Sequence, residues 1–256
     1  MTDAREPARD DLGFPLPAGG PARRVVSLVP SLTESVAVTR PGALAGATQW
    51  CTHPPGLDVP RVRGTKNPDV AAIVALRPDL VLANQEENRR LDVDRLRAAG
   101  VPVWVTVIRS VEEATGSLRR LFADGLRWPV PDWVAQAERA WSAPPPARAR
   151  RAVICVWRDP WMVVGRDTFT GDVAARLGLA NAFGDDPGRY PKADLAAIAA
   201  RDPELVLLPD EPYPFSAADG PEAFPGRRAA LVSGRDLTWY GPSLTGARTR
   251  LAAALG

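Results

Sequence analysis

The sequence predicts an α/β fold of two similar lobes, each built around a small parallel β-sheet, and the main evidence is an internal repeat. Residues 73–82 read IVALRPDLVL and residues 198–207 read IAARDPELVL, about 125 positions later. Each segment follows an apolar run that starts with two arginines, RRVVSLV at 23–29 and RRAVICV at 150–156. A helix end, a turn at proline and a β-rich apolar run form the pattern of a parallel α/β unit. Two copies predict two lobes with a ligand cleft between them, at the carboxyl ends of the strands.

In the first half of the chain, strand and helix signals alternate as such a unit requires. Ser31 and Glu34 have the spacing of a capping box, so a helix should begin there, directly after the first strand. The free backbone N–H groups at its start should face the ligand. The expected elements are strands at 24–29, 43–48, 79–83 and 101–106, helices from 31, at 69–76 and at 89–99, and a proline-rich loop at 52–68.

The middle of the chain reads as the connection between the lobes. Apolar residues have helical spacing at 111–126 and 132–142, but Pro129 and Pro131 interrupt the pattern. We expect a tail at 1–22, a first lobe at 23–127, a linking helix with a proline-rich connection at 128–149, and a second lobe at 150–256. The second lobe should contain strands at 151–157, 204–208 and 229–233 and helices at 171–178, 193–200 and 243–255.

Composition excludes several classes of protein. The 256 residues are 45% hydrophobic with a net charge of +2, which predicts a folded chain. Lys66 and Lys192 are the only lysines and the arginines form no basic stripe, so no nucleic-acid partner is expected. No run approaches the roughly 18–20 apolar residues that span a bilayer. Residues 1–22 lack the apolar core of a signal peptide, which predicts a cytoplasmic protein. The alternative is export, if an upstream leader is missing.

Aromatic side chains gather in the loops that should follow strands. In a parallel sheet these loops share one edge, and an exposed aromatic cluster there favours a binding crevice. Aromatic residues also fill cores, so each of them could be core instead. The candidates are Trp50, Trp157, Trp161, Tyr213, Phe215, Trp239 and Tyr240.

Charged residues occupy the same loops. Glu86 and Glu211 are equivalent in the repeat, and each comes just after a predicted strand. Two such carboxylates could hold a cationic or hydrogen-bond-donating ligand. Arg158 and Arg166 follow the strand at 151–157, and Arg158 could also simply pair with Asp159.

The metal and catalytic possibilities are narrow. His53 is the only histidine, and with Cys51 it supplies two candidate ligands at most, so a bare transition metal is not expected. A chelated metal, in a corrinoid, a haem or a siderophore, needs only walls and a few polar contacts. No nucleophile elbow, phosphate loop or dinucleotide fingerprint is present, so we expect no enzyme and no built-in cofactor. The alternative is an enzyme acting in the same cleft, with His53, Cys51, Glu86 or Glu211 transferring protons.

Five segments together resemble the cobalamin- and iron-siderophore-binding class of ABC-transporter substrate-binding proteins, from about residue 11 to the C-terminus. They are RVVSLVPSLTE at 24–34, WCTHPP at 50–55, NPDVAAIVALRPDLVLA at 67–83, GVPVWV at 100–105 and AARDPELVLL at 199–208. The resemblance implies the two-lobed fold of class III periplasmic binding proteins, in which one long helix joins the lobes. It also implies non-catalytic binding of a metal chelate.

The resemblance also implies site residues. In the vitamin B12 binders, residues that follow several of the strands contact the ligand, and so does a segment that corresponds to 236–240 here. Thr65 and Asn84 stand where those binders often have tryptophan, which implies a more polar crevice. The other mapped positions are Ser31, Trp50, Trp157 and Tyr190.

Two departures from the family concern partners and motion. Exported members carry a glutamate on each lobe that pairs with arginines of the membrane permease, but the corresponding positions here are Ala71 and Ala196. We therefore expect no permease docking of the usual kind, and a partner such as an enzyme of cofactor handling. Pro129 and Pro131 should break the linking helix and leave a shorter helix at 132–142.

Overall fold

The computed structural model describes residues 7–256. The chain forms two compact units, and each contains segments that are distant in the sequence. Unit 1 comprises the chain through Ile108, Glu113–Ala135 and Tyr240–Pro242. Unit 2 comprises Arg109–Glu112, Gln136–Trp239 and Ser243–Gly256. Within residues 7–256, no helix has both the length and the apolar character needed to cross a membrane.

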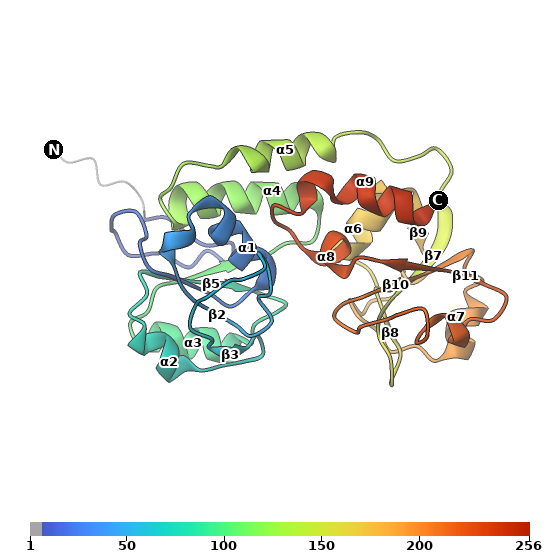
Figure 1. Ribbon diagram of the computed structural model, residues 1–256, viewed down its shortest axis with the longest axis horizontal. Coiled ribbons are helices and arrows are strands. Elements are labelled where there is room, and N and C mark those ends of the chain that lie inside the picture. The colour runs from blue at the N-terminus through green and yellow to red at the C-terminus, as the bar shows by residue number, and fades with distance from the viewer. Residues whose placement is uncertain (1–6) are drawn as a thin grey trace. The chain divides into compact units, whose positions relative to one another are not determined.

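Unit 1 is built on a four-stranded parallel sheet in the order β2-β1-β5-β6. Its strands are β1 (Val25–Ser27), β2 (Leu44–Ala47), β5 (Leu80–Asn84) and β6 (Val103–Thr106). Helices α2 and α3 lie on one side of the sheet, and α1 and α4 lie on the other (Figure 1). These helices are α1 (Pro30–Thr39), α2 (Val70–Ala75), α3 (Arg90–Ala98) and α4 (Val111–Arg120), and a two-stranded ribbon is formed by β3 (Arg63–Gly64) and β4 (Asn67–Pro68).

Unit 2 repeats this arrangement. Strand β7 pairs in parallel with β9 and β10, β10 pairs with β11, and β8 adds an antiparallel contact to β7. The strands are β7 (Arg150–Trp157), β8 (Met162–Val163), β9 (Leu179–Asn181), β10 (Leu205–Pro209) and β11 (Arg228–Val232). The helices are α6 (Phe169–Arg176), α7 (Leu195–Ala200), α8 (Gly234–Thr238) and α9 (Leu244–Leu255). The β7, β9, β10 and β11 strands match β1, β2, β5 and β6 in order and direction, which confirms the predicted duplication.

The duplication extends to single hydrogen bonds. The Arg24 guanidinium donates to the last carbonyl of the α2 turn at 2.8 Å, and the Arg151 guanidinium donates to the equivalent carbonyl after α7 at 2.5 Å. Asp79 and Glu204, which follow the turn proline in each copy, accept the backbone N–H groups of these two arginines. The paired arginines therefore fasten each helix end to the start of the first strand of its sheet.

Residues 8–16, within the segment expected as an N-terminal tail at 1–22, are folded onto unit 1; residues 1–6 lie outside the described part. Asp10 is buried and forms an ion pair with Arg97 at 2.7 Å. It also accepts a hydrogen bond from the backbone N–H of Val105 on β6, while Asp11 accepts one from Val107. These carboxylates bind backbone donors of the edge strand β6 and the residues just after it, so the segment covers the sheet edge.

The connecting region differs from the single linker expected at 128–149. Helix α4 runs into one π-helical turn at Leu121–Gly125, the chain is extended at Pro129–Pro131, and α5 spans Asp132–Ala140. The prolines thus interrupt the helical path as predicted. The chain passes from one unit to the other between Ile108 and Arg109, within α4, within α5 and on either side of Tyr240–Pro242.

Candidate functional site

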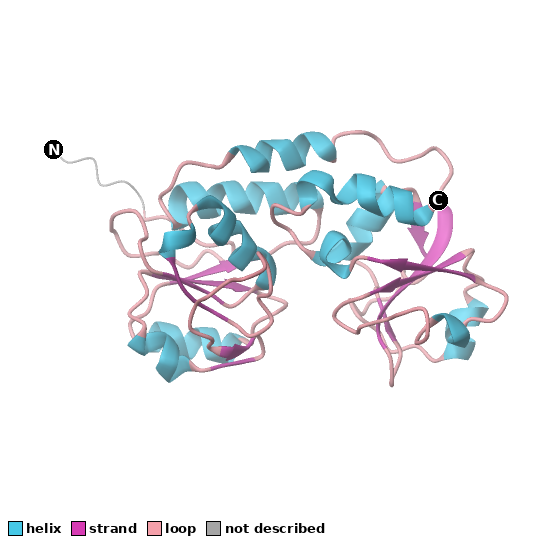
Figure 2. Cartoon of the chain, in the orientation of Figure 1, coloured by secondary structure: helices cyan, strands magenta, loops and turns pink. Residues whose placement is uncertain are grey.

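The predicted site residues follow strands that run in the same direction within each unit. In unit 1, Ser31 and Trp50 come after β1 and β2, and Asn84 ends β5. In unit 2, Trp157 ends β7, and the loops that carry Tyr190 and Glu211 follow β9 and β10. The carboxyl ends of parallel strands meet at one edge of a sheet, so each unit gathers its candidates at one edge. We call the loops at these edges the strand-end loops; they are drawn in pink in Figure 2.

Three aromatic side chains stand out on these loops because they are exposed. Of the 8 tryptophans and 3 tyrosines, all within residues 7–256, the exposed ones are Trp50 at 60%, Trp157 at 41% and Tyr190 at 37%. Burying large aromatic side chains is favourable, so three left in water at the strand ends offer apolar surface to a ligand.

Four of the other aromatic candidates, Trp161, Phe215, Trp239 and Tyr240, are buried, whereas Tyr213 is partly buried. Trp161 is only 9% exposed, and it stacks on Phe215 with ring centroids 5.8 Å apart and packs edge-on against Phe224. Trp239 and Tyr240 are 6% and 5% exposed. These buried side chains offer little exposed surface, and their contact with a ligand stays a prediction.

Ser31 and Asn84 have structural roles. Pro30 occupies the first position of α1 and Val29 is its N-cap, so Ser31 lies inside the helix, and the predicted capping box does not form. Ser31 is 2% exposed and Asn84 is 3% exposed. Neither side chain presents the surface that a ligand-contact residue needs.

Asn84 instead organises the loop after β5. Its side chain donates to the Thr106 hydroxyl at 3.1 Å and accepts the backbone N–H of Glu86 at 2.8 Å. Asn88 in turn accepts the backbone N–H of Asn84 and donates to the carbonyl oxygen of Thr65 at 2.9 Å. The two amides therefore bring Glu86 and Thr65, both predicted contacts, to the same edge of the sheet.

Tyr240 is fixed within unit 1. Its hydroxyl donates a 2.8 Å hydrogen bond to a carboxylate oxygen of Glu87, the residue beside Glu86. Burial, followed by the charge of Glu87, raises the pKa of Tyr240 well above its ordinary value. The phenol is therefore a permanent donor that orients the loop after β5.

In unit 2, a charged cluster lies beside Trp157. Arg158 forms ion pairs with both Asp219 and Glu222, and its guanidinium lies 5.5 Å from the ring centre of Trp161. A hydrogen bond from Arg158 lowers the pKa of Glu222. The expected pairing of Arg158 with Asp159 is a long contact of 3.7 Å. This cation is therefore already neutralised by carboxylates of its own unit.

Tyr213 joins the same cluster. Its ring packs edge-on against Trp157, with centroids 5.6 Å apart, and its hydroxyl donates to Asp219 at 2.7 Å. That hydrogen bond raises the pKa of Tyr213, because it favours the protonated phenol. Arg166 is half exposed and has Asp167 as an ion-pair partner at 3.6 Å.

Glu211 is the candidate with the most unusual surroundings. Burial is the largest cause that raises its pKa, ahead of the nearby Asp210 charge, while the Trp239 indole donates a hydrogen bond to it. One of its carboxylate oxygens is buried with no hydrogen-bond partner in the described structure. Gly234 permits this placement, since a Cβ there would lie 2.3 Å from the Cγ of Glu211.

Cys51 and His53 do not form a metal site. The Cys51 thiol is buried against the hydroxyls of Thr33 and Thr48, and burial raises its pKa. Burial also raises the pKa of Cys155 to about 12. Residues 7–256 contain no group of three or more His, Cys, Asp and Glu side chains that could hold a metal ion. Both thiols therefore serve as core side chains.

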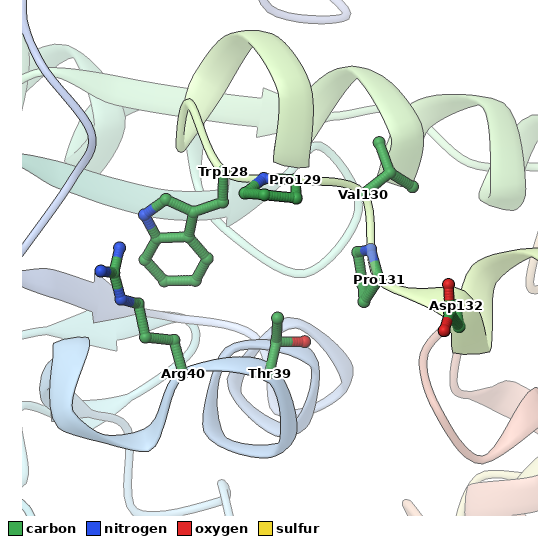
Figure 3. Close-up of a pocket in the computed structure, with 7 residues that line it drawn as sticks. All are labelled: Thr39, Arg40, Trp128, Pro129, Val130, Pro131 and Asp132. Atoms are coloured by element: carbon green, nitrogen blue, oxygen red, sulfur yellow. The ribbon is translucent and has the colours of Figure 1, made fainter.

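Two surface cavities in unit 1 lie away from the strand-end loops. One of about 400 Å³ lies at the far end of α1, where the Arg40 guanidinium is 5.3 Å from the Trp128 ring centre (Figure 3). Trp128 donates to the carbonyl of Ala22, just before β1, which places this cavity at the opposite edge of the sheet. The second, of about 510 Å³, is lined by residues 16–23 and their neighbours. Neither coincides with the predicted site.

Several residues of these loops had no individual signal in the sequence. Glu87 and Asn88 follow the predicted Glu86, but only the fold shows that they bind Tyr240 and Thr65. Asp219 and Glu222 lie in a Gly- and Pro-rich stretch that reads as an ordinary surface loop. Taken together, however, Asp219 and Glu222 carry a sequence signal. Two carboxylates in the loop after one strand can neutralise an arginine, here Arg158, that follows a neighbouring strand.

Comparisons with known proteins identify relatives and similar folds. No protein-family model matches the chain. It is 27% identical over 198 residues to the vitamin B12-binding protein of Salmonella choleraesuis (strain SC-B67), covering 73% of this chain and 72% of that one. Among solved structures, the periplasmic haem-binding protein BhuT in complex with two haems has a TM-score of 0.76 at 26% identity, over 93% of this chain and 98% of that chain.

A further structural neighbour supports the fold. The periplasmic vitamin B12 binding protein BtuF of Vibrio cholerae also has a TM-score of 0.76, at 16% identity and over 93% of this chain and 98% of that one. These relatives are binding proteins and not enzymes, in agreement with the prediction of a non-catalytic protein. In fold and in sequence, the chain is therefore similar to ABC-transporter substrate-binding proteins that bind vitamin B12 or haem.

Proposed function

We propose that this protein binds a metal chelate of the vitamin B12 or haem class without catalysis, through residues of its strand-end loops. The observation that carries the proposal is the exposure of Trp50, Trp157 and Tyr190 at strand ends, at positions predicted from the sequence. Flat macrocycles bury much apolar area, and exposed indole and phenol rings supply matching surfaces. The names of the relatives support the same ligand classes.

A spectroscopic titration tests this proposal. Cyanocobalamin, cobinamide, haem and a ferric siderophore would each be added to the protein, and tryptophan fluorescence would be followed with inner-filter correction and calorimetry. We expect saturable binding of at least one chelate, weakened about tenfold or more by Trp157→Ala, because the exposed ring loses its buried contact area.

The matched control is Leu195→Ala. Leu195 is 40% exposed on α7, comparable to Trp157, but it lies on a helix and not on a strand-end loop. Binding should be unchanged in this variant. Equal loss in both variants, or no binding of any chelate by the wild type, would contradict the proposal.

We also propose that docking to a membrane permease, if this protein has one, does not use glutamate–arginine pairs at the usual positions. Ala71 on α2 and Ala196 on α7 are both exposed. Placing glutamate at both positions tests the idea: binding to a permease that carries the matching arginines should appear only in the Ala71→Glu, Ala196→Glu variant. The cytoplasmic location stays a prediction that cell fractionation would test.

A further inference from the structure

We propose that the strand-end loops select a chelate whose rim carries uncharged amide groups, as a corrinoid does, and reject one whose rim carries free carboxylates, as haem does. This inference rests on the proposed function and concerns the choice between its ligand classes. It follows from how the charged side chains of these loops are already paired.

The first observation concerns the cation nearest the exposed ring of Trp157. A carboxylate-bearing ligand needs an available arginine or lysine. Arg158 is in position but binds Asp219 and Glu222 at once. The Glu222 carboxylate is in addition anchored by the backbone N–H of Gly220 at 2.6 Å. A ligand carboxylate would have to displace one of these fixed anions, and the other would still repel it.

The second observation concerns the possible axial ligand. Ferric haem is held by residues such as histidine, cysteine or tyrosinate. Tyr213 is the tyrosine beside Trp157, and its proton is committed to Asp219. Forming the phenolate of Tyr213 would place a second negative charge next to that carboxylate, so this tyrosine is disfavoured as an iron ligand. A corrinoid brings its own metal ligands and makes no such demand.

The third observation concerns Glu211. One of its oxygens is buried without a hydrogen-bond donor among the described residues, although a buried acceptor is costly to leave unpaired. An amide N–H of a ligand rim would satisfy this oxygen. A ligand carboxylate would meet this oxygen with like charge, and the other charges beside it are those of Asp210 and Arg235.

Three further cations lie in or near the strand-end loops. The Lys66 ammonium donates to the carbonyl of Glu86, and Arg189 donates to the carbonyl of Asp167 at 2.7 Å. Lys192, beside the Tyr190 loop, has no ion-pair partner among residues 7–256. The experiment must therefore ask whether Lys192 alone can serve a carboxylate.

The decisive experiment uses two corrinoids that differ by one group. Cyanocobalamin and its monocarboxylic acid, in which one rim amide is hydrolysed, would be compared by calorimetry at pH 7, with haem as a third ligand. We expect the amide form to bind at least tenfold more tightly than the acid, and haem to bind more weakly still.

Variants identify the cause. The double variant Asp219→Asn, Glu222→Gln converts two fixed anions into neutral groups of similar shape and so frees Arg158. The ratio of the affinities for the amide and acid forms should fall by about tenfold in this variant. Glu211→Gln should also narrow the preference. Lys192→Ala should leave the preference unchanged. Thermal unfolding of each variant checks that it is folded.

The outcomes separate this inference from the proposed function. Equal or tighter binding of the carboxylate ligands by the wild type overturns the charge selection but leaves chelate binding intact. A haem affinity that falls in Lys192→Ala would likewise overturn the charge selection and leave chelate binding intact. Failure to bind any of the three ligands overturns the proposed function itself.

Discussion

The Tyr240 hydroxyl donates a 2.8 Å hydrogen bond to Glu87, although the two residues are 153 positions apart in the sequence. Tyr240 begins a three-residue segment of unit 1 whose flanking residues, Trp239 and Ser243, belong to unit 2. Asp236 and Arg250 pair at 2.6 Å on either side of this segment and join α8 to α9. The strand-end loop after β5 is therefore held in place by a residue from near the end of the chain.

The Tyr240–Glu87 contact should show energetic coupling. A double-mutant cycle with Tyr240→Phe and Glu87→Gln would measure the free energy of unfolding by urea denaturation. Because the acceptor is charged and the phenol is buried, each single variant should lose about 1–3 kcal/mol, and the double variant should lose clearly less than the sum. Additive losses would mean that the hydrogen bond contributes nothing measurable.

Gly241 should tolerate no side chain. A Cβ at this position would lie 2.9 Å from the Ser31 carbonyl oxygen and 3.0 Å from the Ser35 hydroxyl, both on α1. Gly241→Ala should lower the melting temperature, because a backbone atom cannot move aside without shifting the helix. The matched control is Gly116→Ala within α4, where a Cβ meets nothing within 4 Å. Gly116→Ala should stabilise the protein by about 0.5–1 kcal/mol. A higher melting temperature in both variants would refute the close approach of Gly241 to α1.

The buried Asp10–Arg97 pair should matter far more than a surface pair. The Asp10 side chain is fully buried and Arg97 is 16% exposed, whereas Arg90 and Asp94 are 94% and 54% exposed. Asp10→Ala should cost about 3–5 kcal/mol of unfolding free energy, since it leaves a largely buried guanidinium unpaired. Asp94→Ala should change stability by less than about 0.5 kcal/mol. If Asp10→Ala lowered the unfolding free energy as little as Asp94→Ala, the Asp10–Arg97 pair would not help to hold residues 8–16 on the edge of β6.

Glu211 should make stability depend on pH. Its pKa in the folded protein is raised above the ordinary 4.5, so the folded state binds this proton more tightly than the unfolded chain does. The wild type therefore loses this contribution as pH rises from below 4.5 through the folded pKa. Glu211→Gln does not titrate, so its stability relative to wild type should increase between pH 4 and pH 7. Parallel pH profiles of the two proteins would contradict the raised pKa.

The sequence by itself determined the duplicated α/β architecture. The repeat of helix end, proline turn and apolar strand at 73–82 and 198–207 is local, and each element follows from spacing and turn chemistry within about ten residues. The same patterns located the residues after the strands, so Trp50, Trp157 and Glu211 could be named without the fold. The break at Pro129 and Pro131 was equally local, because proline cannot continue a helix.

Only the tertiary structure decided which of these residues are exposed and which are paired. Trp157 at the end of β7 and Trp161 in the turn that follows are only four residues apart, yet Trp161 is buried and Trp157 is exposed. The neutralisation of Arg158 by Asp219 and Glu222, and the bond from Tyr240 to Glu87, join segments that no sequence periodicity relates. Periodicity reports which way a side chain faces along one element, whereas burial and ion pairing depend on what other elements bring against it.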